Sequence, residues 1–511
     1  MKKNETEQKS WSQCITLIAI IALFFILMYQ SPFRLDDLAW GSERGIERLQ
    51  RGFRGYNGRY IGNLIVIILT RFPAGLRVLM EMAILVGGIW NVWILLKRNN
   101  DILMLFLALL LAAPPAIFNQ TILWVSGFSN FVVSAVFVFY IFRICMEMLE
   151  GTVDISFKTG VVHVLLIFMG QMILETGSIY TIILLFFTGI CILVQKKKVP
   201  IYLSAYFIGA CAGAAVMFSN SSYRAAVLGN GDTYKKISIS GDFFQLINTW
   251  WTKYTTQIFP NWIQNIPLIN LLLILCIVIL CFWSASRFSG MIQMLGAFFA
   301  AWIVFNIQKP DWNSLIPYGV YLNAIVGIVW MIYVLVSIMM LNIEYTEKRL
   351  LLFAAGSQIF MVSPLIVADP LTDRCFFQNY VFWVLLICML LRLCLLKLAD
   401  IKISRKIKRF MKLMPNCFVI GTLFMLVASQ FMSWRVADIR KAEIEKCLEE
   451  NADSIILPYN PSESTYCYGD NIANDNRSWI YKYKMYYDIP REVNLTFVDY
   501  NTYVTMKEQK K

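Results

Sequence analysis

The sequence contains a single histidine and few charged residues. A single histidine excludes a histidine-rich metal site. Because this residue, His163, stands at the start of an apolar stretch, we expect it to be a helix-end residue and expect no Ser-His-Asp triad of normal geometry. Charged residues make up 15% of the chain, well below the roughly 25% of a typical soluble domain. The cysteines mostly lie inside apolar stretches and form no Cys-X-X-Cys pair, so we expect them to behave as small hydrophobic residues. Acid–base chemistry would have to come from carboxylates, tyrosine or lysine.

Apolar residues dominate what is present. They make up 58% of the chain and fall into repeated stretches of about 17 to 25 residues, long enough for a helix to cross the roughly 30 Å hydrocarbon core. We therefore predict an all-α integral membrane protein with about 13 transmembrane helices. The predicted spans cover residues 14–30, 74–96, 102–118, 127–149, 160–175, 178–195, 199–219, 266–284, 288–307, 316–341, 350–368, 375–397 and 416–434.

The polar segments divide the chain into three parts. Residues 1–13 form a short N-terminus, 14–434 the transmembrane domain, and 435–511 a polar, aromatic tail that we expect to fold as a small α/β cap. The longest polar inserts inside the transmembrane domain are the loops 31–60 and 220–262. An apolar but short stretch at the end of the first loop predicts an interfacial helix there.

The distribution of lysine and arginine predicts the orientation, because basic residues accumulate in cytoplasmic loops. With a cytoplasmic N-terminus, most of the basic loop residues fall inside, the run Lys397–Lys412 most clearly, and the tail 435–511 lies outside. The loop 31–60 is the exception, because it carries six arginines on the outer side. The net charge of +13 is explained by orientation and contact with membrane lipids rather than by nucleic acid.

In this orientation the polar residues that could support chemistry gather on the outer face. Carboxylates near membrane depth are costly and often mark a functional cavity. The candidates are Asp36, Asp37, Arg54, Asn57, Arg59, Trp124, Asn130, Glu175, Asp373 and Arg374. Structural roles are the alternative for each: the acidic pair as a helix cap, Arg59 as an interfacial anchor, Glu175 as a hydrogen-bond partner.

Five short motifs resemble those of the GT-C superfamily of polytopic membrane glycosyltransferases, most closely a bacterial group of multi-spanning glucosyltransferase-like proteins. The motifs are Leu35-Asp36-Asp37, Tyr56-Asn57-Gly58-Arg59-Tyr60, Trp124-Val-Ser-Gly127-Phe-Ser-Asn130, Glu175-Thr-Gly-Ser and Pro364 through Arg374-Cys-Phe-Phe. The resemblance covers residues 14–435, apart from the tail. It implies a GT-C-like helix arrangement in a bacterial plasma membrane and transfer of a sugar from a polyprenyl-phosphate donor to a glycan or glycolipid acceptor of the cell envelope.

The resemblance also implies roles for the candidate residues. Asp36 or Asp37 would act as the catalytic base, and Arg54, Arg59 and Arg374 would stabilise the departing phosphate, since arginine is always charged and binds phosphate in a bidentate manner. Some members hold a divalent cation, Mg²⁺ or Mn²⁺, with the acidic residue. The two aspartates could contribute to such a site, although the sequence offers no further ligand set.

Two other functions fit the same sequence. An envelope polysaccharide polymerase or ligase would also use a lipid-linked substrate, although many polymerases have their largest outer loop late in the chain. A lipid-linked sugar transporter or flippase is the third hypothesis. Against it, the sequence shows no inverted repeat, and its polar residues gather at one face rather than at the midplane.

Overall fold

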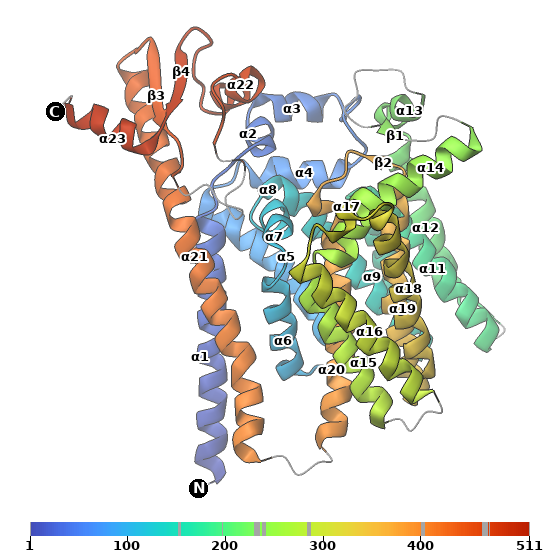
Figure 1. The fold of residues 1–511 in the computed structure, drawn as a ribbon. Helices are drawn as coiled ribbons and strands as arrows, with labels where there is room; N and C mark the ends of the chain where they lie inside the picture. The colour runs from blue at the N-terminus through green and yellow to red at the C-terminus, as the bar shows by residue number, and fades with distance from the viewer. Residues whose placement is uncertain are drawn as a thin grey trace.

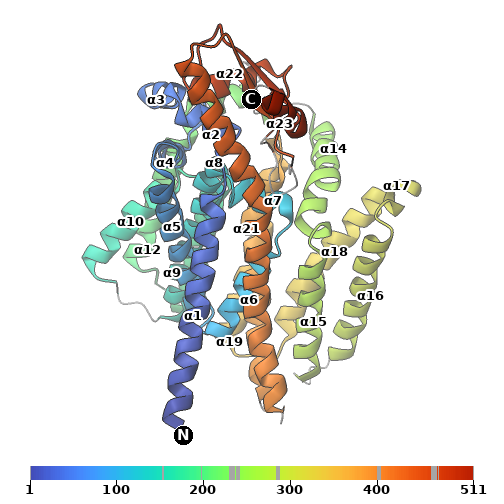
Figure 2. The same ribbon diagram turned by 90° about the vertical axis from the view of Figure 1, so that its left-hand side faces the viewer.

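In a computed structural model the protein is a bundle of long helices with a small cap at one end (Figures 1 and 2). The structure describes residues 2–151, 155–196, 198–228, 236–237, 242–283, 288–399, 404–461, 469 and 471–509. The N-terminus lies at the end of the bundle opposite the cap. We refer to the two ends as the cap end and the opposite end.

Within the described residues, nine helices are long and apolar enough to cross a membrane, and up to eleven spans result if two bent pairs each count as one. The nine are α5 (Ala74–Leu95), α8 to α9 (Val125–Glu150), α11 (Glu175–Lys196), α12 (Ile201–Phe218), α16 (Ser289–Gln308), α18 (Gly319–Met340), α19 (Tyr345–Val362) with η4 (Ser363–Ile366), α20 (Phe377–Ala399) with η5 (Asp373–Phe376), and α21 (Arg405–Glu449). Three apolar helices are shorter: the Ile15–Tyr29 part of α1 (Lys2–Tyr29), α4 (Tyr60–Leu69) and α10 (Phe157–Gly170). The architecture is that of an all-α, multi-pass membrane protein.

The predicted span 102–118 is not one straight helix. It consists of α6 (Asn100–Leu111) and α7 (Pro115–Thr121), which meet at 97°. The break follows from Pro114 and Pro115, because proline cannot donate a backbone hydrogen bond and disfavours helical geometry in the residue before it. The second bent pair, with an angle of 61°, joins Phe243–Gln264 to α15 (Pro267–Trp283).

The last spanning helix reaches further than the sequence indicates. Helix α21 packs beside α1 along the bundle and continues beyond residue 434 into the cap (Figure 2). The predicted boundary at 434 follows the loss of apolar residues. The helix instead ends at Glu449, because its polar continuation packs against strand β3 (Ser454–Pro458).

The cap is a small α/β unit. Strands β3 and β4 (Asn494–Val498) pair in parallel, and α22 (Arg477–Tyr486) and α23 (Tyr500–Gln509) accompany them. The buried side chains of the cap include Leu457 and Phe497, and they share one core with Leu38 of the loop 31–60. The cap is therefore packed onto the loop that carries the acidic pair.

The two long polar loops are largely helical. The first contains α2 (Asp36–Gly41) and α3 (Glu43–Gln50) and leads into α4. The second contains α13 (Ser221–Leu228), β1 (Lys236–Ile237), α14 (Phe243–Lys253), η2 (Tyr254–Ile258) and η3 (Pro260–Gln264). Strand β1 pairs with β2 (Ala368–Asp369), and the short helix α17 (Trp312–Leu315) precedes α18.

Candidate functional site

Several sequence-predicted residues meet at the cap end of the bundle. They come from the first loop, from the π-helical turn η1 (Phe128–Val132), from the start of α11 and from η5. A π-helical turn inside an α-helix is uncommon and frequently occurs at functional sites. Here it carries Asn130 and Phe131.

Asp37 points into the protein. Its side chain has no exposed surface, and it accepts hydrogen bonds from the backbone N–H of Ser126 at 2.8 Å and from the Ser126 hydroxyl. The backbone N–H of Arg34 lies 3.3 Å from its second oxygen. Burial raises the pKa of Asp37 to about 6, although the hydrogen bonds from Ser126 favour the charged form. The arrangement fixes α2 against the start of the span Val125–Glu150.

Asp36 points the other way, towards the cap. Its side chain is 40% exposed, and its Oδ1 lies 3.4 Å from the Nζ of Lys482 in α22. Consecutive helical residues differ by about 100° in direction, so one aspartate of the pair is buried and its neighbour is accessible.

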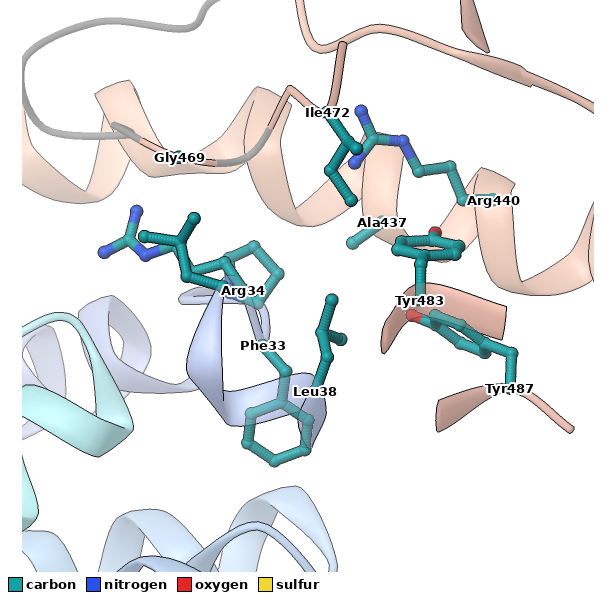
Figure 3. Close-up of a pocket in the computed structure, with 11 residues that line it drawn as sticks. Phe33, Arg34, Leu38, Ala437, Arg440, Gly469, Ile472, Tyr483 and Tyr487 are labelled. Atoms are coloured by element: carbon teal, nitrogen blue, oxygen red, sulfur yellow. The ribbon is translucent and has the colours of Figure 1, made fainter. Parts of the chain in front are cut away.

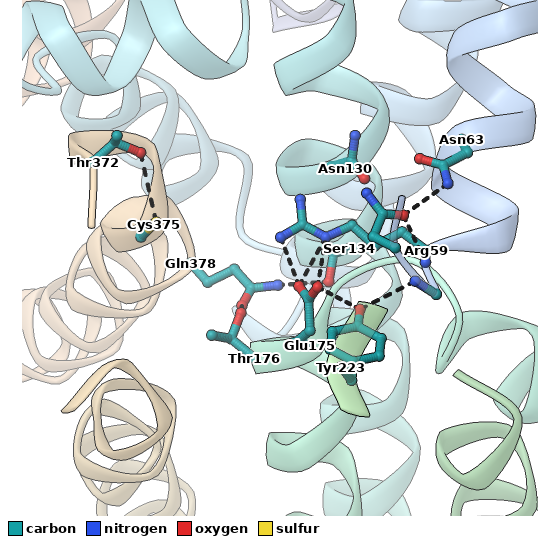
Figure 4. A network of polar contacts seen from close by, with 12 residues as sticks. Arg59, Asn63, Asn130, Ser134, Glu175, Thr176, Tyr223, Thr372, Cys375 and Gln378 are labelled. Carbon is teal, nitrogen blue, oxygen red and sulfur yellow. Dashed lines mark hydrogen bonds and ion pairs between the residues drawn. The ribbon is translucent and has the colours of Figure 1, made fainter. Parts of the chain in front are cut away.

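Arg59 and Glu175 form a bidentate ion pair, seen at the centre of Figure 4. The Arg59 Nε lies 2.9 and 2.8 Å from the two carboxylate oxygens, and an Nη lies 2.7 Å from Oε2. The hydroxyl of Tyr223 in α13 donates to Glu175 at 2.6 Å. Burial alone would lower the pKa of Arg59, but the negative charge of Glu175 outweighs it and raises that pKa. The pair locks the first loop to the start of α11.

Arg374 reaches the same region from η5. Its guanidinium lies 4.9 Å from the ring centre of Trp124 and 5.9 Å from that of Phe131. The guanidinium of Arg59 also lies 5.9 Å from the Phe131 ring. Within the described part of the chain no carboxylate lies within ion-pair distance of Arg374, so its charge is available to a ligand.

Tyr56 connects the acidic and basic residues. Burial raises the pKa of its hydroxyl, and the negative charge of Asp36 raises it further. The positive charges of Arg48, Arg59 and Arg374 act on the same hydroxyl in the opposite direction and lower its pKa. The charges of Asp36, Arg59 and Arg374 therefore all act on one tyrosine hydroxyl.

The remaining predicted residues divide into two groups. Asn57 is buried and bonds to the amide of Asn63 at 2.8 Å and to the backbone of Arg59 at 3.1 Å, so it shapes the turn before α4. Asn130 is also buried; it donates to the backbone of Ser126, and its Oδ1 is a buried acceptor with no hydrogen bond.

Two predicted residues lie towards the edge of the group. Asp373 accepts a hydrogen bond from Gln120 at 3.3 Å. Arg54 is exposed, and the structure does not bring its side chain to the others.

The sequence analysis missed several charged residues near the site. Arg77 and Glu81 lie one helical turn apart in α5, and both are 3% exposed. Arg77 donates to the backbone of Met28 at 3.1 Å and Ser31 at 3.3 Å. A charged pair inside the apolar stretch 74–96 was the signal that could have identified them. The cap residue Lys482 carried no comparable signal.

A narrow cleft runs between the first loop and the cap (Figure 3). Phe33, Arg34 and Leu38 line it on one side, and Arg440 and Tyr483 on the other. Gly469 in the cap has φ of +84°, and a Cβ there would lie 2.6 Å from a methyl group of Leu35. The close approach required at this glycine shows how tightly the cap covers the loop.

A divalent cation held by protein ligands alone does not fit these residues. Asp36 and Asp37 point apart, and Asp37 is already engaged by Ser126. Among the described residues no group of three or more histidine, cysteine or acidic side chains could hold a metal ion. The geometry instead places the accessible carboxylate of Asp36 beside the ammonium group of Lys482.

Comparison with family models, with curated proteins and with solved structures gave no match for this chain.

Proposed function

We propose that the protein is a membrane glycosyltransferase of the GT-C type in the bacterial plasma membrane. It moves a sugar from a polyprenyl-phosphate donor to a glycan or glycolipid acceptor of the cell envelope, at the extracytoplasmic face. The nine long helices, the two bent pairs, α1 and α10 together make the 13 spans of this proposal, with α4 at the interface. The N-terminus is then cytoplasmic, and the cap end is extracytoplasmic.

One observation carries the proposal: an accessible carboxylate, Asp36, and an arginine without an ion pair among the described residues, Arg374, come from distant segments and both act electrostatically on the hydroxyl of Tyr56. Asp36 is 40% exposed, whereas Asp37 has no exposed surface. Arg374 has aromatic contacts and no ion pair within the described residues. Transfer of a sugar from a lipid phosphate requires these two elements, a base for the acceptor and a cation for the leaving group.

In the proposed reaction Asp36 acts as the general base. An acceptor hydroxyl oxygen attacks the anomeric carbon of the donor sugar, and its proton passes to the Asp36 carboxylate. The bond between the anomeric carbon and the phosphate oxygen breaks, and the bonding electrons leave with the polyprenyl phosphate. A single displacement of this kind inverts the anomeric configuration.

The leaving phosphate is stabilised by Arg374. Its guanidinium presents several donors in a plane, a geometry that matches phosphate oxygens. Arg59 contributes less free charge because Glu175 holds it in a bidentate pair. We assign Arg59 and Glu175 the role of holding the first loop against α11, so that Asp36 and Arg374 keep their separation.

Asp37 is a positioning residue in this proposal. Its hydrogen bonds to Ser126 fix the helix that carries Asp36. The direction of the Asp36 side chain therefore depends on a neighbour that does not touch the substrate.

The test is sugar transfer by the purified protein in proteoliposomes, with a panel of polyprenyl-phosphate sugars and envelope glycolipids. Asp36→Asn should lower the rate by about 10²–10⁴-fold, which is the usual contribution of a general base. Glu43→Gln, an exposed carboxylate in the adjacent helix, is the matched control and should leave the rate unchanged. A wild-type rate in Asp36→Asn, with normal insertion of both proteins, would rule out this mechanism.

A further inference from the structure

A second group of basic residues lies on the cap side of Asp36. It consists of Arg44 and Arg48 in α3 and Lys482 in α22. Lys482 pairs with Asp36 at 3.4 Å. The group joins the first outer loop to the cap, because α2 packs against α22.

Arg48 is held in place by aromatic rings. Its guanidinium lies 4.2 Å from the ring centre of Tyr56 and 4.6 Å from that of Trp40. Its Nη1 is hidden from solvent and has no hydrogen-bond partner. An unpaired buried donor on a charged group is costly, so this nitrogen is suited to an acceptor that a ligand supplies.

Lys482 is equally constrained. Its side chain is only 14% exposed, and its Nζ lies 3.5 Å above the ring of Trp479. Burial lowers the pKa of Lys482, the charge of Asp36 raises it, and the charges of Arg44 and Arg48 lower it again. The cap thus presents a fixed ammonium group within the electrostatic reach of both arginines.

The charges in this group do not balance. Within the described residues neither Arg44 nor Arg48 has a carboxylate at ion-pair distance, and Asp36 is the one carboxylate that pairs with Lys482. Asp36, Arg44 and Arg48 all act electrostatically on Lys482, and the carboxylates of Glu43 and Glu47 in α3 are exposed, which leaves an excess of positive charge around Lys482. A concentration of cations on low-dielectric walls attracts an anion.

We propose that Arg44, Arg48 and Lys482 bind a phosphate or carboxylate group of the acceptor beside Asp36, and that the acceptor is therefore anionic. The inference rests on the proposed sugar transfer. The protein would then have two anion sites with different surroundings. The site for the donor phosphate contains Arg374, which lies beside Trp124, and the site for the acceptor contains Arg48, which lies over the ring of Tyr56. An anion in the second site holds the acceptor next to the base, and the cap becomes part of the substrate-binding site.

Binding of inorganic pyrophosphate to the full-length protein in detergent, measured by calorimetry, tests the site without any sugar transfer. Arg374→Gln serves as the parent, because it removes the other anion site. Adding Arg48→Gln or Lys482→Met should weaken binding at least tenfold. Adding Arg51→Gln, an exposed arginine of the same loop, should leave binding unchanged. Unchanged affinity in both the Arg48 and the Lys482 variants would overturn the proposal.

A kinetic experiment then identifies which substrate carries the anion. Arg48→Gln and Lys482→Met should raise the KM for the acceptor about tenfold and leave the KM for the donor unchanged, and Lys482→Arg should restore most of the loss. A rise in donor KM alone would overturn the assignment to the acceptor. If the wild type transfers no sugar but binds pyrophosphate through Arg48 and Lys482, the proposed function fails while the anion site stands.

Discussion

The buried aspartate makes the stability of the protein depend on pH in a defined direction. Burial raises the pKa of Asp37 to about 6 in the folded protein, from an ordinary value of 3.8. The folded state therefore holds this proton more tightly than the unfolded state does. The stabilisation that the protonated carboxyl provides is complete below pH 3.8 and is lost as the pH rises through 6.

The size of the effect follows from the difference between the two pKa values. At about 1.4 kcal/mol per unit, a difference near two units corresponds to about 3 kcal/mol. In Asp37→Asn the amide oxygen can still accept the hydrogen bonds from Ser126, and the side chain no longer titrates. We therefore expect the stability of wild type relative to Asp37→Asn to fall by about 3 kcal/mol between pH 4 and 7.

The assay is thermal unfolding in detergent at several pH values, for the wild type, Asp37→Asn and Asp36→Asn. Asp36→Asn retains the buried carboxyl and should follow the wild-type profile. The Asp37→Asn profile should diverge from the wild-type and Asp36→Asn profiles above pH 4. The difference between the profiles should level off above pH 6. Parallel profiles for the wild type and Asp37→Asn would refute the assignment of Asp37 as a buried group that is protonated more readily in the folded state.

Two further predictions concern the packing around the site. Glu175→Gln leaves Arg59 without its ion-pair partner. Because both side chains are 20% exposed, we expect the free energy of unfolding to fall by an amount between the roughly 1 kcal/mol of an exposed ion pair and the roughly 3 kcal/mol of a buried one. The loss of stability would appear as a lower unfolding midpoint. Removing both charges in the double variant Arg59→Met/Glu175→Met should cost less stability than Glu175→Gln alone. A Glu175→Gln protein as stable as the wild type would contradict this prediction. Leu38→Ala removes a first-loop side chain that is 1% exposed in the core of the cap and should cost about 2–5 kcal/mol. Faster proteolysis of the cap in Leu38→Ala would reveal this loss of stability. Leu49→Ala, at an exposed position of the same loop, should not accelerate proteolysis. Equal rates of proteolysis in the two variants would argue against a shared core.

The spanning helices were predictable because their signal is local. A helix must bury an apolar stretch of sufficient length in the membrane, so composition and length identify it. The bend before Pro115 could also have been predicted from the sequence, because consecutive prolines interrupt a helix. The continuation of α21 past residue 434 was not, because its polar end is stabilised by strands that follow it in the chain.

The candidate site was predictable only in part. The predicted sidedness placed Asp36, Arg59, Glu175 and Arg374 on one face. The structure brings Arg59, Glu175 and Arg374 together around Phe131, whereas Asp36 points towards the cap. The sequence alone could not show which of the two adjacent aspartates is buried, because the burial of one and the exposure of the other depend on what α2 packs against. Lys482 was missed for the same reason: its contact with Asp36 requires the cap to fold back onto the first loop.

The proposed function requires the acidic pair and the cap to lie outside the cell. Labelling intact cells with a membrane-impermeant maleimide tests this directly, with single added cysteines at two exposed positions. Glu43→Cys lies in α3, close to the acidic pair in the chain, and Arg98→Cys lies in the connection from α5 to α6, which is at the opposite end of the bundle (Figure 1). Relative to the wild type with its native cysteines, we expect added labelling at position 43 in intact cells and at position 98 only after lysis. Labelling at position 43 that requires lysis would contradict this expectation.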